Sequence, residues 1–241
     1  MSSNRVELTK EQFDNSELPF PNNCVLVEMT YCTDGVKTKG GIIVGFNKDV
    51  LYAEGEDAHN ADLQEVSGIV TRVPEKLYFN PKDPNSMLWE TDMELQVGDL
   101  VWFGIMESSN AQEILCEGRL YKIIPYADII VARRRMDVIV LNGYALCQTV
   151  NRQKISDLDV ISEESIDTTR CIVRYVGKPN KRYKVKNHID HKDLKPGDVV
   201  LLQPRTSFWY LERKRYLANF NGDELYIVVP RRKIVMVIDR D

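Results

Sequence analysis

The residues best suited to chemistry lie near the C-terminus, where His188 and His191 flank the carboxylate of Asp190. Such a group could ligate zinc if a further ligand came from elsewhere in the fold. No cysteine and no third histidine is close in the sequence, so we expect solvated loop residues and no metal. The chain also has no G-x-S-x-G motif and no phosphate-binding glycine-rich loop before a helix. These observations predict neither catalysis nor a cofactor.

A second candidate for chemistry combines aromatic and basic side chains. Ser207-Phe208-Trp209-Tyr210 stands beside Arg213-Lys214-Arg215, a pattern that could stack nucleic-acid bases while the cations hold phosphate. The same place in the first half of the chain, residues 106–115, has the pattern of a strand. The sequence therefore favours a packed strand followed by a charged turn over a nucleic-acid site.

Net charge differs between the two ends of the chain. The whole chain has a formal charge of −4, yet residues 171–241 contain 16 Lys and Arg against 8 Asp and Glu. A basic region of this kind can bind nucleic acid or face an acidic neighbour in an assembly. The charge alone leaves both alternatives open, and we do not expect a nucleic-acid partner.

A third segment is suited to binding rather than to reaction chemistry. Lys39-Gly40-Gly41-Ile42-Ile43-Val44-Gly45 places three aliphatic residues between glycines within a polar stretch. Outside any strand, these side chains would form an exposed apolar patch, which usually marks a partner site. The alternative is that residues 41–44 form one more strand of the sheet, with the glycines in a bulge.

The elements that position these segments occur twice. Four segments of the first half resemble four segments of the second half in the same order. They are Val25-Leu26-Val27 with Ala145-Leu146-Cys147, residues 69–73 with 172–176, residues 95–103 with 194–202, and residues 120–125 with 225–230. Such ordered self-similarity indicates a tandem repeat of one small β domain. Between the first two blocks the second copy is shorter by 17 residues, and the glycine-aliphatic run lies in the extra stretch of the first copy.

Apolar and β-branched residues favour short strands, and helical periodicity is nearly absent. We expect strands over residues 24–30, 68–73, 100–104, 112–116, 119–124, 129–132, 138–148, 170–176, 199–203, 208–216, 224–229 and 233–238. Residues 1–22 are polar and predict an arm of uncertain order. Residues 37–65 and 74–94 do not follow the strand pattern, and we expect them to form projecting loops or hairpins. The fold class is thus all-β, with two tandem small barrels over residues 23–133 and 134–241.

The ordered set of motifs resembles the GroES-like co-chaperonins. Val25-Leu26-Val27-Glu28, Thr38 to Val44, Ser67-Gly68-Ile69-Val70, residues 97–103 and residues 128–132 follow one another with the family's spacing, and the resemblance extends to a degenerate second copy. It implies a barrel subunit that forms a ring over the mouth of a chaperonin, a large ATPase ring. The family's mobile loop falls on residues 32–45, and its docking residues fall on Gly40, Gly41, Ile42, Ile43 and Val44. Its roof element falls on residues 74–94, which include Lys76, Leu77, Tyr78 and Phe79.

Two functions follow as expectations. In the first, the protein is a non-enzymatic co-chaperonin that forms a cyclic homo-oligomer and caps a chaperonin during protein folding. In the second, it is a structural ring component of a large assembly, such as a virus particle, whose loops are fixed subunit contacts. In either case a ring could be built from the first copy alone, with the second copy as a further layer.

Composition sets the expected compartment. No apolar run approaches the ~20 residues that span a bilayer, and the first residues have no hydrophobic signal core. Five cysteines without a C-x-x-C pair are typical of reduced core thiols. We expect a cytoplasmic protein with no membrane partner.

Overall fold

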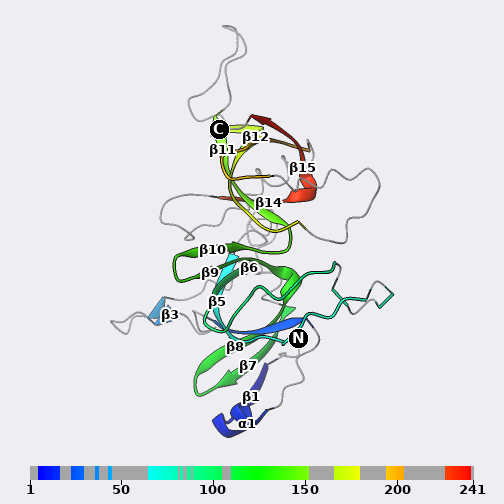
Figure 1. Cartoon of the computed structure of the whole chain (residues 1–241). Coiled ribbons are helices and arrows are strands. Elements are labelled where there is room, and N and C mark those ends of the chain that lie inside the picture. The colour runs from blue at the N-terminus through cyan, green and yellow to red at the C-terminus, as the bar shows by residue number, and fades with distance from the viewer. Residues whose placement is uncertain are drawn as a thin grey trace. The chain divides into compact units, whose positions relative to one another are not determined.

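The computed structural model describes residues 5–16, 23–29, 36–37, 43–44, 65–80, 82–83, 86–87, 89–104, 110–151, 166–179, 194–203 and 226–239. Most of these residues lie in β-strands, with one short helix and two 3-10 turns, so the fold is all-β as predicted. The chain divides into two compact units, Met1–Ile139 and Val140–Asp241 (Figure 1). Each unit has its own large sheet.

The first unit contains an eight-stranded sheet in the order β1-β7-β8-β2-β5-β6-β9-β10. Its pairs are antiparallel apart from β1, which is parallel to β7. The strands are β1 (Arg5–Leu8), β2 (Cys24–Met29), β5 (Glu65–Arg72), β6 (Leu100–Gly104), β7 (Gln112–Cys116), β8 (Arg119–Pro125), β9 (Ile129–Arg134) and β10 (Asp137–Val140). The helix α1 (Lys10–Asn15) follows β1, and the 3-10 turn η1 (Tyr126–Asp128) joins β8 to β9.

Two further strands of the first unit stand outside this sheet. β3 (Val36–Lys37) and β4 (Ile43–Val44) pair with each other in an antiparallel two-stranded sheet, with Val36 opposite Val44 and Lys37 opposite Ile43. Both lie in the long connection from β2 to β5.

The second unit contains a five-stranded sheet in the order β14-β11-β12-β13-β15. All of its pairs are antiparallel. The strands are β11 (Tyr144–Asn151), β12 (Ile166–Val176), β13 (Val199–Leu202), β14 (Ile227–Pro230) and β15 (Ile234–Asp239), and the 3-10 turn η2 (Arg231–Lys233) joins β14 to β15.

The five strands of the second sheet reproduce five neighbouring strands of the first. The order β8-β2-β5-β6-β9 corresponds strand by strand to β14-β11-β12-β13-β15, so the two units share one strand order. The register agrees as well, since Val27 opposite Val70 becomes Cys147 opposite Val173. Even the irregularity that precedes Val27 recurs before Cys147.

Consecutive residues are buried in the central strands of the repeat, such as Val25 to Val27 and Ala145 to Cys147. In the second unit, Ala145, Cys147, Cys171, Val173, Val200 and Ile227 belong to one buried apolar cluster. Gly68 of the first unit corresponds to Cys171, and an added Cβ there would lie 2.4 Å from Val27 Cγ1 and 2.7 Å from the Glu28 carbonyl oxygen. At this place in the core, the first unit therefore has Val27 beside Gly68, and the second unit has Cys147 beside Cys171.

Two sequence predictions need correction. The first strand is β1 rather than a strand near Asn23, because Arg5–Leu8 finds a pairing partner in β7, far away in the sequence. A single strand over residues 138–148 is also wrong. The chain turns at Asn142 and Gly143, both with positive φ, so that β10 completes the first sheet and β11 begins the second.

Candidate functional site

The predicted docking residues lie in the connection between β2 and β5. Gly40, Gly41 and Ile42 lie outside the described residues, whereas Ile43 and Val44 form β4. β4 pairs with β3, and the two strands form a short antiparallel hairpin. The sheet that carries this connection is described on both sides, since β2 and β5 pair with each other and also with β8 and β6. The predicted docking segment thus lies in the connection between two central paired strands of the first sheet.

The predicted roof segment, residues 74–94, is held to the sheet at its beginning by Asn23. The side-chain Nδ2 of Asn23 donates to the Tyr78 carbonyl (3.1 Å), and its Oδ1 accepts from the Tyr78 backbone N–H (2.6 Å). Asn23 has φ of 74°, a conformation that asparagine tolerates better than most residues. One side chain therefore pairs with the backbone of Tyr78 in the way that a neighbouring strand would.

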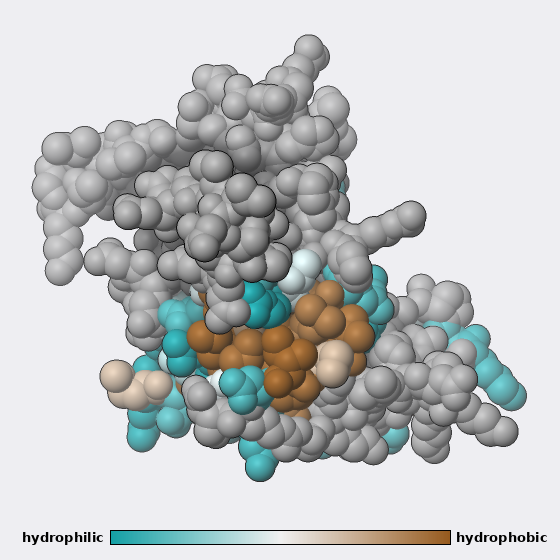
Figure 2. All heavy atoms as spheres, turned by 90° about the horizontal axis from the view of Figure 1, so that it is seen from above, coloured by the Kyte–Doolittle hydropathy of each residue, from teal (hydrophilic) through white to brown (hydrophobic). Residues whose placement is uncertain are grey.

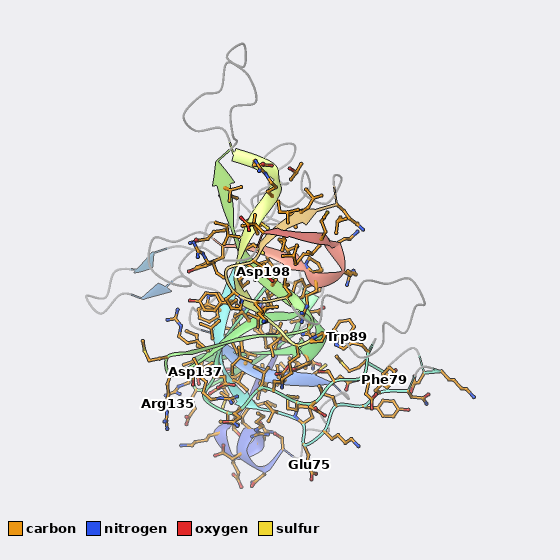
Figure 3. All side chains as sticks on the ribbon, turned by 45° about the horizontal axis from the view of Figure 1, so that its top comes forward. Glu75, Phe79, Trp89, Arg135, Asp137 and Asp198 are labelled. Atoms are coloured by element: carbon orange, nitrogen blue, oxygen red, sulfur yellow. The ribbon has the colours of Figure 1, made fainter. Side chains whose placement is uncertain are left out.

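The four predicted roof residues have different surroundings. Leu77 is buried (4% exposed), Tyr78 is 38% exposed, Lys76 is exposed and Phe79 is half-buried. Met87 and Trp89 further along are buried too, and the Met87 N–H donates to the Tyr78 carbonyl at 2.9 Å. The described part of residues 74–94 forms no β-hairpin. It is an irregular segment with buried anchors, and Figure 3 labels Glu75, Phe79 and Trp89 along it.

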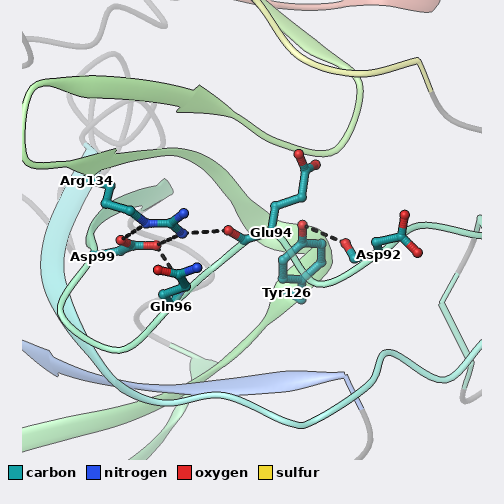
Figure 4. Close-up of polar contacts among 6 residues, drawn as sticks. All are labelled: Asp92, Glu94, Gln96, Asp99, Tyr126 and Arg134. Atoms are coloured by element: carbon teal, nitrogen blue, oxygen red, sulfur yellow. Dashed lines mark hydrogen bonds and ion pairs between the residues drawn. The ribbon is translucent and has the colours of Figure 1, made fainter.

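A charged contact holds the end of the roof segment. The Arg134 guanidinium donates to both carboxylate oxygens of Asp99 (2.8 Å each) and to the Glu94 carbonyl (2.7 Å), as Figure 4 shows. Asp99 is almost fully buried, whereas the Arg134 side chain is 31% exposed. The hydrogen bonds to Asp99, and the attraction between the charges, raise the pKa of Arg134. This contact joins the segment to β9, from which Arg134 extends.

Tyr126 forms a second contact with the end of the roof segment. Its hydroxyl lies 3.5 Å from the Asp92 carbonyl oxygen, and its ring is fully buried (Figure 4). Burial, with the nearby charge of Glu94, raises the pKa of the Tyr126 hydroxyl far above its usual range. The roof segment is thus fixed at both ends by neutral and charged hydrogen bonds.

The turn before β6 also supports the segment, and its partners emerge only from the structure. Asp99 Oδ2 accepts from the Gln96 N–H, just as Asp198 Oδ2 accepts from the Lys195 N–H, both at 2.8 Å. Gly98 and Gly197 have φ of 93° and 96°, which favours glycine. The recurring Gly-Asp pair in the sequence indicated this turn, but nothing in the sequence placed Arg134 against Asp99.

The remaining predicted sites lie elsewhere. His188, Asp190, His191 and residues 207–215 are outside the described residues. Within the described ranges, no group of three or more His, Cys, Asp or Glu side chains is placed to hold a metal ion. Figure 2 shows apolar side chains gathered on one face, with hydrophilic ones beside them. The exposed large apolar side chains of the described residues include Val97, Met136, Val235, Met236 and Ile238.

Comparison with models of protein families and with curated proteins gave no match. The described part of the chain contains no helix of the length and apolar character that crossing a membrane requires. The features that bear on function are the repeat, the roof segment and the docking segment.

Proposed function

We propose that this protein is a co-chaperonin-like ring subunit, built from two GroES-like barrels, that caps a chaperonin during protein folding. One observation carries the proposal. Ile43 and Val44 lie on a two-stranded hairpin that belongs to neither large sheet, in the connection between the central paired strands β2 and β5. The second copy has no Gly-Gly-aliphatic run in the equivalent connection, so docking is assigned to the first unit alone.

Energetics explain why a ring would be needed. Burying three aliphatic side chains stabilises a contact by roughly 1.5–3 kcal/mol each, before the cost of ordering the backbone. Fixing each backbone residue costs about 1–2 kcal/mol. A single segment therefore binds weakly and releases readily, while several segments on one ring bind together through their high effective concentration. Ile42, Ile43 and Val44 supply the apolar contact, and Gly40 and Gly41 supply the conformational freedom.

The roof segment has a supporting role in this proposal. Leu77, Met87 and Trp89 anchor it, while Lys76 and Tyr78 are exposed. Exposed side chains on an anchored segment suit the rim or roof of a ring, where they would meet neighbouring subunits or an enclosed client.

The test is co-sedimentation of the purified protein with a chaperonin in the presence and absence of ATP. Ile43→Asp should abolish nucleotide-dependent binding, because a charge replaces a docking side chain, and should leave the fold intact. Val97→Asp is the matched control, since Val97 is 65% exposed in the turn before β6 and is outside the docking segment. Equal binding by wild type and Ile43→Asp would contradict the proposed docking role.

One observation favours the second candidate function, a structural ring component of a large assembly. The pairing of β4 with β3 gives Ile43 and Val44 a regular strand conformation, which suits a permanent subunit contact. In that case wild type would form its oligomer and would not bind a chaperonin with or without ATP, and Ile43→Asp would alter the oligomer itself.

A further inference from the structure

The N-terminal arm, residues 5–16, lies outside the structural repeat. β1 and α1 have no counterpart among the described elements of the second unit, whose five-stranded sheet corresponds to β8, β2, β5, β6 and β9. β1 is the last strand at one end of the first sheet, and it is parallel to β7. It can therefore leave β7 without breaking the pairing of β7, β8 and β2.

Few side chains hold the arm in place. Helix α1 buries no residue, and only Leu8 of β1 is half-buried. Leu8 and Phe13 pack against a cluster of Leu26, Ile114, Cys116 and Tyr121, and the Phe13 and Tyr121 rings are 4.7 Å apart. Local opening is favoured where a segment has few buried apolar contacts.

The polar contacts of the arm are specific. Arg5 pairs with Glu113, the residue opposite it on β7, at 3.0 Å, and Lys122 of β8 also pairs with Glu113 at 3.0 Å. Arg72 lies over the Phe13 ring and donates to the Phe13 carbonyl (2.8 Å) and the Ser16 carbonyl (3.1 Å). The receiving surface therefore contacts the Arg5 side chain of β1, the Phe13 ring of α1 and backbone carbonyls at the end of α1.

We propose that the arm is exchanged between copies of this chain, so that β1 and α1 of one copy occupy the β7 edge of another. Every contact that fixes the arm within a chain can be made identically between chains, because the receiving surface is the same in each copy. Exchange of identical elements is a low-cost route to oligomers. The occupant of the β7 edge is thus residues 5–16 of a second copy, whether or not the protein binds a chaperonin.

The test uses two full-length chains, one with Arg5→Cys and one with Glu113→Cys. Neighbouring strands are about 4.8 Å apart, within the Cα separation that disulfides span. The chains are mixed at equal concentration, incubated and oxidised, and the 5–113 linked peptide is sought by mass spectrometry. Each chain has one partner of the pair, so any such link is between copies. A mixture of Arg5→Cys with Val97→Cys is the collision control.

We expect the 5–113 link in the mixture to exceed the control by at least about tenfold, since pairing gives a high effective concentration. A chain with both substitutions verifies that the two positions are close enough to bond. If this double variant forms the link within one chain while the mixture forms none above control, the arm stays with its own chain and the proposal is wrong.

A second measurement keeps opening and exchange separate. Leu8 and Phe13 cover the cluster that contains Cys116, so Phe13→Ala should increase the rate of Cys116 alkylation several-fold, read at the level of the peptide. An unchanged rate of alkylation would contradict the idea that the arm protects Cys116 and can be removed from it. Neither measurement involves a chaperonin, and loss of chaperonin binding in Ile43→Asp would leave both results as they are.

Discussion

The last strand of the repeated sheet has a different neighbour in each unit. In the first unit β9 is covered by β10, whereas in the second unit β15 is the last described strand. Both strands contain a bulge, at Ile130 and at Val235, where the register skips one residue. β15 adds a second bulge at Ile238.

The difference shows two ways to prevent unwanted pairing at a sheet edge. A strand on the outside of a sheet offers free backbone groups to any extended chain, and a bulge twists those groups out of line. In the first unit β10 pairs with the outer side of β9, whereas in the second unit two bulges interrupt β15. The two bulged residues, Val235 and Ile238, are exposed, as is the paired residue Met236.

The largest expected effect tests how the two units fill the same place in the core. Gly68→Ala should lower the free energy of unfolding of the first unit by about 2–3 kcal/mol, because the new methyl group meets Val27 and the Glu28 carbonyl. Cys171→Ala at the equivalent place removes bulk and should cost about 1 kcal/mol in the second unit. Hydrogen exchange during urea denaturation, read by peptide, resolves the two units.

A double variant sharpens this prediction. Val27 is fully buried, so Val27→Ala is itself destabilising, and the informative quantity is the cost of Gly68→Ala in each background. In the Val27→Ala background the side-chain clash is gone and the clash with the backbone stays, so Gly68→Ala should cost less than in wild type but still destabilise. No cost in either background would show that the strands separate easily and that the glycine is not required.

The next effect concerns the ion pair that holds the roof segment. We compare the stability lost when a part-buried arginine is replaced with that lost when an exposed arginine is replaced. Arg134→Met keeps the aliphatic stem and leaves Asp99 buried without its guanidinium, which should cost about 1–2 kcal/mol after allowing for solvent exposure. Arg119→Met removes an exposed pair with Glu28 at 3.3 Å and should change little. Thermal unfolding of both variants measures the difference, and equal losses would contradict the role of Asp99.

A smaller effect should come from making the first unit resemble the second at Asn23. Its counterpart is Gly143, which also has a positive φ, so Asn23→Gly keeps the backbone and removes only the amide that holds Tyr78. We expect a loss of about 1–2 kcal/mol, seen as faster exchange of the Tyr78 N–H. Gly143→Asn is the reciprocal control and should leave that exchange unchanged. Unaltered exchange in Asn23→Gly would mean that Leu77 and Met87 hold the segment alone.

The smallest effect depends on pH and concerns the arm, which the second unit lacks in its described residues. Burial raises the pKa of Glu113, but hydrogen bonds and charges from Lys122 and Arg5 outweigh it and hold that pKa below its usual range. The stability from this pair is therefore present at neutral pH and is lost as the pH falls through the lowered pKa. We expect the arm to lose at most about 1 kcal/mol of stability. The rate of Cys116 alkylation, measured at decreasing pH and corrected for thiolate content, reports this loss. Glu113→Gln should remove this acid-dependent change, and persistence of the change in that variant would assign it to another group.

Strand positions could be predicted from the sequence because apolar alternation and turn residues are local signals. Residues 100–104 and 112–116 form strands with the predicted bounds. The helix α1 was missed although its signal was present. Thr9 and Gln12 form a capping box, in which each side chain accepts from the other residue's backbone N–H (3.2 and 2.9 Å).

The supports of the candidate site could not be predicted, because they join residues that are far apart in the chain. Asn23 finds Tyr78, and Arg134 finds Asp99, only when the sheet brings their strands together. The burial of Leu77 has the same origin, since its apolar type fitted an exposed roof and a buried anchor equally well. The docking role of Ile43 and Val44 stays a prediction.

The parallel pairing of β1 with β7 also sets an order of events during synthesis. Arg5 leaves the ribosome before its partner Glu113, which follows 108 positions later. At a synthesis rate of about 5–20 residues per second, β1 is made roughly 5–20 seconds before β7. The part of the first unit that is made first is therefore among the last to be fixed, and on a polysome it has this interval in which to meet a neighbouring nascent chain.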